Sequence, residues 1–127
     1  MVEEINESYE NYLKAIFQIT QTKKGGWCSN SEISEYLNVR PASVTGMLHK
    51  LKDKGLIKWE PRKSLRLTKR GREIAQNTLD KYNTLKDFFI HVLNLRDRTL
   101  TDKLCCGMEH HITNKVSESL RDLIEID

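Results

Sequence analysis

The sequence predicts a mainly helical fold in which a winged helix-turn-helix module precedes an all-helical second part. Three patterns predict it: apolar residues recur at helical spacing along most of the chain, two short helices separated by a tight turn lie between residues 29 and 55, and a short hairpin pattern follows them. After the hairpin only helical periodicity continues. We place the boundary after residue 72, which divides the 127 residues into parts 1–72 and 73–127.

The helices of the first part are marked by their end signals. Apolar residues at helical spacing predict a first helix before a Lys-Lys-Gly-Gly run: Ile5, Tyr9, Tyr12, Leu13, Ile16 and Phe17. Ser29 with Glu32 three residues later forms a capping-box pattern that starts a short second helix. Asn38 suits a left-handed turn, and Pro41 suits the first turn of a third helix that closes at Gly55.

A basic hairpin is predicted directly after the third helix. The segments "LIKWE" (56–60) and "LRLT" (65–68) alternate apolar and polar residues, and "PRKS" joins them with Arg62 and Lys63 at the tip. A helix-turn-helix followed by such a hairpin is a winged helix. In that arrangement the third helix enters the major groove and the hairpin follows the DNA backbone.

Charge is concentrated in the same region. Residues 38–72 carry 11 Lys and Arg against 2 Asp and Glu, whereas residues 73–127 carry 7 against 10. A basic block alone is typical of a solvated face, but its coincidence with a winged helix favours duplex DNA as the partner. The DNA contacts expected at the start of the third helix and at the hairpin tip are Arg40, Pro41, Ala42, Ser43, Thr45, Gly46, Lys50, Arg62 and Lys63.

The second part reads as three helices. A long helix opened by Thr68 precedes helices over about 100–111 and 114–126. Their apolar stripes could pack on the chain's own core or form a dimer interface. We expect a homodimer, because operator reading usually needs two half-sites.

The three cysteines indicate a reducing compartment. Their odd number, with Cys105 and Cys106 adjacent, is a poor disulfide framework, so we expect a cytoplasmic protein. No apolar run approaches the length that would span a membrane.

The stretch "CCGMEHH" (105–111) carries candidate metal ligands. On a continuous helix, Cys106, Glu109 and His110 stand at positions i, i+3 and i+4, within one turn, on a polar face with Asp102. The apolar face of this helix is expected to contain Leu100, Leu104, Cys105, Met108 and Ile112. Cys105 is therefore expected in the core, and Met108 and His111 are expected to pack rather than coordinate. The alternative is that these three residues lie on one solvent-exposed face by coincidence and bind no metal.

The chain resembles the diphtheria toxin repressor and manganese transport regulator family of metal-dependent repressors over nearly its whole length. The matching segments are "ENYLKAIF", "SEISEYLNVRPASVTGMLHKLKDKGLI", "LRLTKRGREIA" and "CGMEHHI". The resemblance implies a metal site formed by the first, fourth and fifth helices, and a homodimer that binds palindromic operators when metal is bound. The chain is most similar to the shorter, manganese-regulator type, without an extra C-terminal domain.

The resemblance also implies further ligand positions, several of them changed. Asn11 stands where the family has a first-helix Met or Asp, and Glu10 beside it is a possible substitute. Asn83 stands in place of a His, Asp87 keeps a carboxylate, and Asp102 replaces an ancillary His. A second ion would then be held by oxygen ligands only, or not at all.

The expected metal is Fe²⁺ rather than Mn²⁺, because a thiolate ligand is softer than the oxygen and imidazole donors that Mn²⁺ prefers. Asp87 and Asp102 favour Mn²⁺ instead, since they could form a harder, oxygen-rich site for it.

Two other functions stay open at this point. One is a winged-helix regulator that no longer responds to metal, as the changes at Asn11 and Asn83 would allow. The other is a metalloenzyme, which the absence of an H-E-x-x-H motif or a phosphate-binding loop disfavours.

Overall fold

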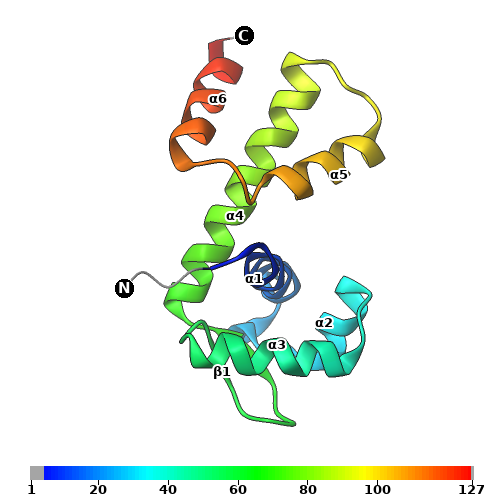
Figure 1. Ribbon diagram of the computed structural model, residues 1–127, viewed down its shortest axis with the longest axis vertical. Helices are drawn as coiled ribbons and strands as arrows, with labels where there is room; N and C mark the ends of the chain where they lie inside the picture. The colour runs from blue at the N-terminus through cyan, green and yellow to red at the C-terminus, as the bar shows by residue number, and fades with distance from the viewer. Residues whose placement is uncertain (1–4, 127) are drawn as a thin grey trace. The chain divides into compact units, whose positions relative to one another are not determined.

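The computed structural model describes residues 5–126 and is mainly helical with one two-stranded sheet (Figure 1). The chain divides into two compact units, residues 1–76 and 77–127. The predicted fold class is confirmed. The expected boundary after residue 72 falls within helix α4 (Lys69–Asp87) and stays a prediction of where the functional domains divide.

The first unit has the element order of a winged helix. Its elements before α4 are α1 (Glu7–Thr20), the 3₁₀ turn η1 (Lys24–Gly26), α2 (Asn30–Leu37), α3 (Pro41–Asp53), β1 (Ile57–Trp59) and β2 (Leu65–Leu67). Helix α1 packs against α2 and β2, α2 packs against α3, and α3 packs against β1. The unit therefore holds the second and third helices and the hairpin on one core.

The end signals in the sequence act as predicted. The Ser29 side chain accepts a hydrogen bond from the Glu32 backbone N–H, and Glu32 Oε1 accepts one from the Ser29 N–H at 3.1 Å, which completes the capping box. Asn38 ends α2 in the left-handed conformation (φ 55°, ψ 50°), Pro41 begins α3, and Gly55 follows α3 with φ +73°. These signals fix the turn between α2 and α3.

The hairpin contains a third partner that the sequence did not reveal. Strands β1 and β2 are antiparallel, with Ile57 opposite Leu67 and Trp59 opposite Leu65. On the other side of β2, Cys28 exchanges two backbone hydrogen bonds with Leu65, at 2.9 and 2.8 Å. Cys28 is buried, and this burial raises the pKa of its thiol to about 11. It is a structural residue of the sheet.

Helix α4 starts against the hairpin through an unusually close approach. A Cβ at Gly71 would lie 2.0 Å from the backbone oxygen of Leu56, so only glycine fits at this position. Thr68 caps the helix by accepting a hydrogen bond from the Gly71 N–H at 3.2 Å, and its hydroxyl donates to the Gly55 carbonyl at 2.8 Å. The start of α4 is thereby locked to the segment between α3 and β1.

The core of the first unit draws on every one of its main elements. Its buried apolar residues are Leu13, Ile16, Cys28, Ile33, Val44, Leu48, Leu51, Leu56, Ile57, Trp59, Leu65, Leu67 and Ala75. Burial of these side chains leaves the polar start of α3 and the hairpin tip on the surface.

The second unit contains the rest of α4, a π-helical turn η2 (Phe88–Val92), α5 (Arg98–Met108) and α6 (Asn114–Ile126). The backbone passes from α4 into η2 without a break, and α6 packs against η2 (Figure 1). No helix among residues 5–126 is long and apolar enough to cross a membrane.

Helix α5 differs from its prediction in length and in its buried face. It was expected over about 100–111, but it ends at Met108, and residues 109–111 form a turn. The side chains buried along it are Thr101, Cys105 and Glu109, at intervals of four residues. The expected apolar face is instead exposed: Leu100, Leu104 and Met108 are 46, 37 and 38% accessible. Cys105 is buried as predicted, but Glu109 lies on the same face and not with Asp102.

Candidate metal centre and DNA-binding surface

The start of α3 presents a polar, exposed surface of the kind that contacts DNA. Six of the predicted contact residues are exposed there: Arg40, Pro41, Ala42, Ser43, Gly46 and Lys50. Thr45 differs, because its hydroxyl accepts a hydrogen bond from Asn30 Nδ2 at 2.8 Å and donates to the Pro41 carbonyl at 3.1 Å. The Thr45 hydroxyl therefore ties α2 to α3 and sets their crossing, a role that the sequence alone did not indicate.

The tip of the hairpin is basic and exposed. Arg62 adopts a left-handed backbone conformation (φ +68°), which is unusual for a residue with a side chain. Lys63 Nζ lies 3.0 Å from Glu60 Oε2 in an ion pair whose two side chains are about 70% accessible, so that it contributes little to stability. Both cations remain available to a phosphate backbone.

Two tryptophans support this hairpin. Trp59 of β1 makes an edge contact with His49 of α3, with ring centroids 4.8 Å apart. The guanidinium of Arg66 lies 5.2 Å from the ring centroid of Trp27. The His49 ring of α3 thus packs against the hairpin.

Two of the three predicted ligands on α5 come together. Glu109 Oε1 and His110 Nε2 lie 3.7 Å apart, and their side chains are 0 and 1% accessible. Cys106 lies on the preceding turn and is half-buried. Within residues 5–126 no three His, Cys, Asp or Glu side chains are close enough together to hold a metal ion. Because α5 ends at Met108, the trio does not share one continuous helical face as expected, and its ligand role stays a prediction.

Asp102 is engaged by a tyrosine to which no sequence motif pointed. Its Oδ1 accepts a hydrogen bond from the hydroxyl of Tyr82 in α4. Burial and this hydrogen bond to Asp102 raise the pKa of Tyr82 well above its usual range. Tyr82 therefore remains protonated and fixes the Asp102 carboxylate. The sequence gives only a weak signal for it, an aromatic residue on the face of α4 that meets α5.

Asp87 is engaged by an arginine of α6. Arg121 Nη1 donates to Asp87 Oδ2 at 2.9 Å, and Arg121 Nη2 donates to Thr84 Oγ1 at 3.0 Å. Asn83, the neighbouring predicted ligand, is exposed. The Asp87 carboxylate thus has a cationic partner from within the chain. Asn11 and Glu10, the predicted ligands on α1, are half-buried residues of the first unit.

The donor set at the end of α5 suits a divalent transition metal. It combines a thiol, a carboxylate and an imidazole, which are the ligand types found in zinc, iron, cobalt and manganese sites. The carboxylate of Glu109 and the imidazole of His110 are both buried and lie 3.7 Å apart, so one divalent ion could use both as ligands. The residues present therefore fit a metal ion.

Two family models match consecutive parts of the chain. Residues 4–65 match "Iron dependent repressor, N-terminal DNA binding domain", and residues 68–125 match "Iron dependent repressor, metal binding and dimerisation domain". The chain belongs to the iron-dependent repressor family. The resemblance seen in the sequence is thereby confirmed. The repressor is a metal-dependent transcriptional regulator, not an enzyme, and its partners are DNA, a divalent metal and a second copy of the chain.

Relatives cover most of the repressor's length. It is 31% identical over 121 residues to an uncharacterized HTH-type transcriptional regulator of Methanocaldococcus jannaschii, covering 95% of each chain. It is 32% identical over 118 residues to the HTH-type transcriptional regulator MntR of Shouchella clausii, covering 93% of the repressor and 80% of the relative. The alternative of a regulator that no longer responds to metal is not favoured by these matches.

A solved structure confirms the architecture. The crystal structure of IdeR from T. acidophilum is 25% identical and superposes with a TM-score of 0.78 over 99% of the repressor. The repressor spans 57% of the length of that chain.

Proposed function

We propose that the repressor binds palindromic operator DNA as a homodimer, and that a divalent metal held by Cys106, Glu109 and His110 switches this binding on. The observation that carries the proposal is the buried Glu109–His110 pair, 3.7 Å apart and one turn after Cys106. It lies in the part of the chain that matches the metal-binding and dimerisation domain. A reducing, cytoplasmic setting suits a regulator whose thiol must stay free.

The metal would join ligands from two parts of the chain. Glu109 and His110 supply a carboxylate and an imidazole from the turn after α5, and Cys106 supplies a thiolate from its last turn. We assign the completing ligand to Asn11 or Glu10 of α1, in the DNA-binding unit. A bound ion would couple metal binding to DNA binding, and a coupling of about 1–3 kcal/mol would give a switch of roughly 5- to 150-fold.

The contacts of the other predicted ligands favour one ion per subunit. The Asp87 carboxylate is held by Arg121, and the Asp102 carboxylate accepts the Tyr82 hydroxyl. Exposed Asn83 offers only a neutral oxygen. A second divalent ion would have to displace a guanidinium from Asp87, which disfavours a second site.

The DNA-contacting surface is assigned to the start of α3 and the tip of the hairpin. Ser43, Gly46 and Lys50 would face base edges and phosphates in the major groove, whereas Arg62 and Lys63 would contact the backbone beside it. Thr45 acts as a positioning residue through Asn30. The 11 to 2 excess of basic residues over 38–72 supplies long-range attraction to DNA that weakens with salt.

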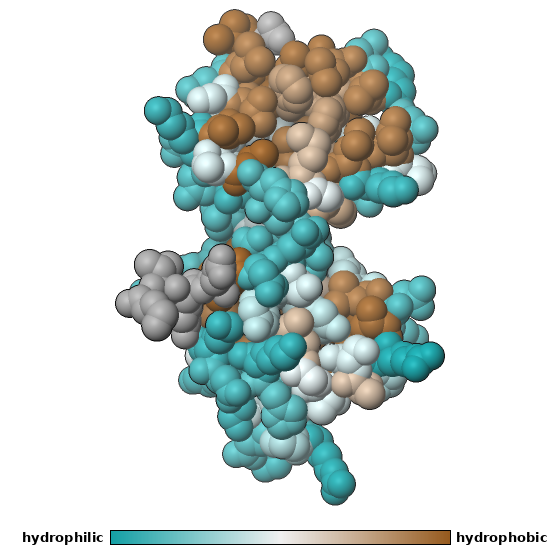
Figure 2. Space-filling model, viewed as in Figure 1, coloured by the Kyte–Doolittle hydropathy of each residue, from teal (hydrophilic) through white to brown (hydrophobic). Residues whose placement is uncertain are grey.

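The homodimer interface is assigned to the second unit. Figure 2 shows apolar side chains gathered over one face of this part of the molecule. The large apolar residues exposed in the second unit are Leu93, Leu100, Leu104, Met108, Val116, Leu123 and Ile126. A surface this apolar is typical of protein–protein contacts, and a second copy would cover it.

The identity of the metal is the finer question. The thiolate of Cys106 favours Fe²⁺, whereas the name MntR of the relatives favours Mn²⁺.

The test uses an operator selected from a random duplex pool in the presence of both metals. DNA binding is then measured under anaerobic, reducing conditions while each metal is titrated separately. Activation at a lower free concentration of Fe²⁺ is the expected result. Activation by Mn²⁺ at the lower concentration would overturn the preference, and activation by neither would overturn the metal switch.

A further inference from the structure

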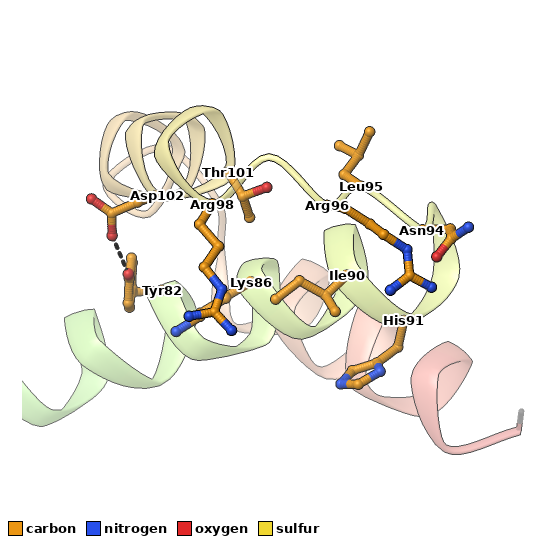
Figure 3. A pocket seen from close by; sticks show the side chains of 10 residues that line it. All are labelled: Tyr82, Lys86, Ile90, His91, Asn94, Leu95, Arg96, Arg98, Thr101 and Asp102. Atoms are coloured by element: carbon orange, nitrogen blue, oxygen red, sulfur yellow. Dashed lines mark hydrogen bonds between the residues drawn. The ribbon is translucent and has the colours of Figure 1, made fainter.

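The second unit contains a pocket that neither the metal site nor the DNA-binding surface uses. It has a volume of about 900 Å³ and lies between the end of α4 with η2, the connecting segment, and the start of α5 (Figure 3). Its lining residues are Tyr82, Lys86, Ile90, His91, Asn94, Leu95, Arg96, Arg98, Thr101 and Asp102. The volume is that of a typical small-molecule site.

The charge of this pocket opposes that of its surroundings. Residues 73–127 have 7 Lys and Arg against 10 Asp and Glu, yet Lys86, Arg96 and Arg98 all line this one pocket and Asp102 is the only carboxylate among its lining residues. Figure 3 shows Arg98 extending from α5 towards α4, and Arg96 extending from the connecting segment. Asp102 accepts the Tyr82 hydroxyl and is thereby turned towards α4.

The three cations are exposed and are not engaged in ion pairs. None of Lys86, Arg96 and Arg98 forms an ion pair with a carboxylate of residues 5–126. Like charges on one pocket wall repel one another, and an anion bound between them would relieve that repulsion. Two guanidinium groups also match the paired oxygens of phosphate and carboxylate groups.

A second, independent feature is the hydroxyl of Thr101. Thr101 lines the pocket and is 2% accessible, and its Oγ1 is buried with no hydrogen-bond partner among residues 5–126. A buried hydroxyl in this state has lost its hydrogen bonds to water without replacement. An oxygen of a bound anion would provide the missing acceptor.

From these two features we infer that the pocket lined by Lys86, Arg96, Arg98 and Thr101 binds a small multivalent anion that carries phosphate or carboxylate groups. The cations provide the attraction, and the Thr101 hydroxyl provides a fixed hydrogen bond. The site needs no metal, so it is independent of the proposed switch at Cys106, Glu109 and His110. It would give the repressor a second input, a small anionic metabolite, beside the metal.

The test uses the full chain freed of metal on a chelating resin. Inorganic phosphate, pyrophosphate and succinate are titrated separately at constant ionic strength, set with sodium chloride, and binding is measured by calorimetry. We expect saturable binding of at least one probe, and the preferred probe tells a phosphorylated ligand from a carboxylate ligand. Absence of saturable binding for all three would overturn the inference.

Variants locate the binding within the pocket. Arg98→Gln and Arg96→Gln should each weaken the binding of the best probe at least tenfold, whereas Lys103→Gln, which removes an exposed cation of α5 outside the pocket, should leave it unchanged. Thr101→Val should weaken binding without lowering the melting temperature of the free protein, because the hydroxyl has no hydrogen-bond partner there to lose. Equal weakening by Lys103→Gln would show general charge attraction and contradict the assignment.

Discussion

Adjacent cysteines near the end of α5 show how position on a helix decides the role of a residue. Cys105 is fully buried, and burial, with the nearby negative groups of Cys106, Asp102 and Glu109, raises the pKa of its thiol to about 11. Cys106, one residue later, is half-buried and next to the proposed metal ligands. We therefore expect Cys105→Ser to lower the free energy of unfolding by about 1–3 kcal/mol, since it buries a hydroxyl, and to keep metal affinity. Cys106→Ser should instead weaken metal binding at least tenfold with little loss of stability.

The measurements for this pair are metal titration and thermal unfolding of both variants. Similar losses of metal affinity in the two would contradict the assignment, because only Cys106 is placed to coordinate.

Gly71 is a residue whose importance no sequence pattern indicated. The space for its Cβ is filled by the Leu56 carbonyl, 2.0 Å away, and backbone cannot move aside as a flexible side chain can. Gly71→Ala should lower the free energy of unfolding by about 3 kcal/mol or more, comparable to severe overpacking in a core.

Gly46 of α3 is the matched control, since a Cβ there meets nothing within 4 Å. Gly46→Ala should stabilise the fold by about 0.5–1 kcal/mol through helix propensity. Chemical denaturation measures both, and a mild Gly71→Ala would show that α4 can shift away from the hairpin.

At the scale of elements, α6 is attached to α4 by a polar connection as well as by apolar packing. Arg121 bonds to Asp87 at 2.9 Å and to buried Thr84 at 3.0 Å, with side chains of Arg121 and Asp87 that are 35 and 40% accessible. Because the ion pair is partly exposed, Arg121→Met should lower the free energy of unfolding by only about 1 kcal/mol. Lys115→Met, on the exposed surface of α6, is the control and should change the free energy of unfolding by less than about 0.5 kcal/mol.

The same variant tests the number of metal ions. Removal of the guanidinium frees the Asp87 carboxylate. Arg121→Met is therefore expected to bind a second ion weakly, whereas the unaltered chain is expected to bind one ion per subunit. Equilibrium dialysis with Mn²⁺ gives both stoichiometries. Two ions bound by the unaltered chain would rule out the proposed role of Arg121.

The elements themselves were predictable where a local signal fixed them. The capping box at Ser29, the left-handed Asn38 and the proline at the start of α3 each act within a few residues, and the structure has them as expected. The end of α5 was not predictable in this way. Gly107 lies inside the helix, one residue before its end, and no proline follows it, so the helical pattern of "CCGMEHH" continues past Met108 although the backbone turns there.

At the scale of the whole molecule, the sequence predicted the class of fold and the family, because a winged helix and a cluster of ligand residues each have a recognisable pattern. It could not predict which side of α5 is buried. Apolar residues at positions 100, 104 and 108 suggested a core face, but a surface that another copy of the chain would cover has the same composition as a core. The contacts of Asp87 with Arg121 and of Asp102 with Tyr82 also escaped prediction, since they join residues 34 and 20 positions apart.

The central claim is that a metal ion at the end of α5 controls DNA binding, and operator affinity with and without Mn²⁺ in Glu109→Gln tests it most directly. This variant keeps the shape of the buried side chain and removes its charge. We predict that Mn²⁺ strengthens operator binding by the unaltered chain roughly 5- to 150-fold. Glu109→Gln should lose this gain and keep the weak, salt-dependent binding of the metal-free protein. If Glu109→Gln responds to Mn²⁺ as the unaltered chain does, the switch is located elsewhere and the account is contradicted.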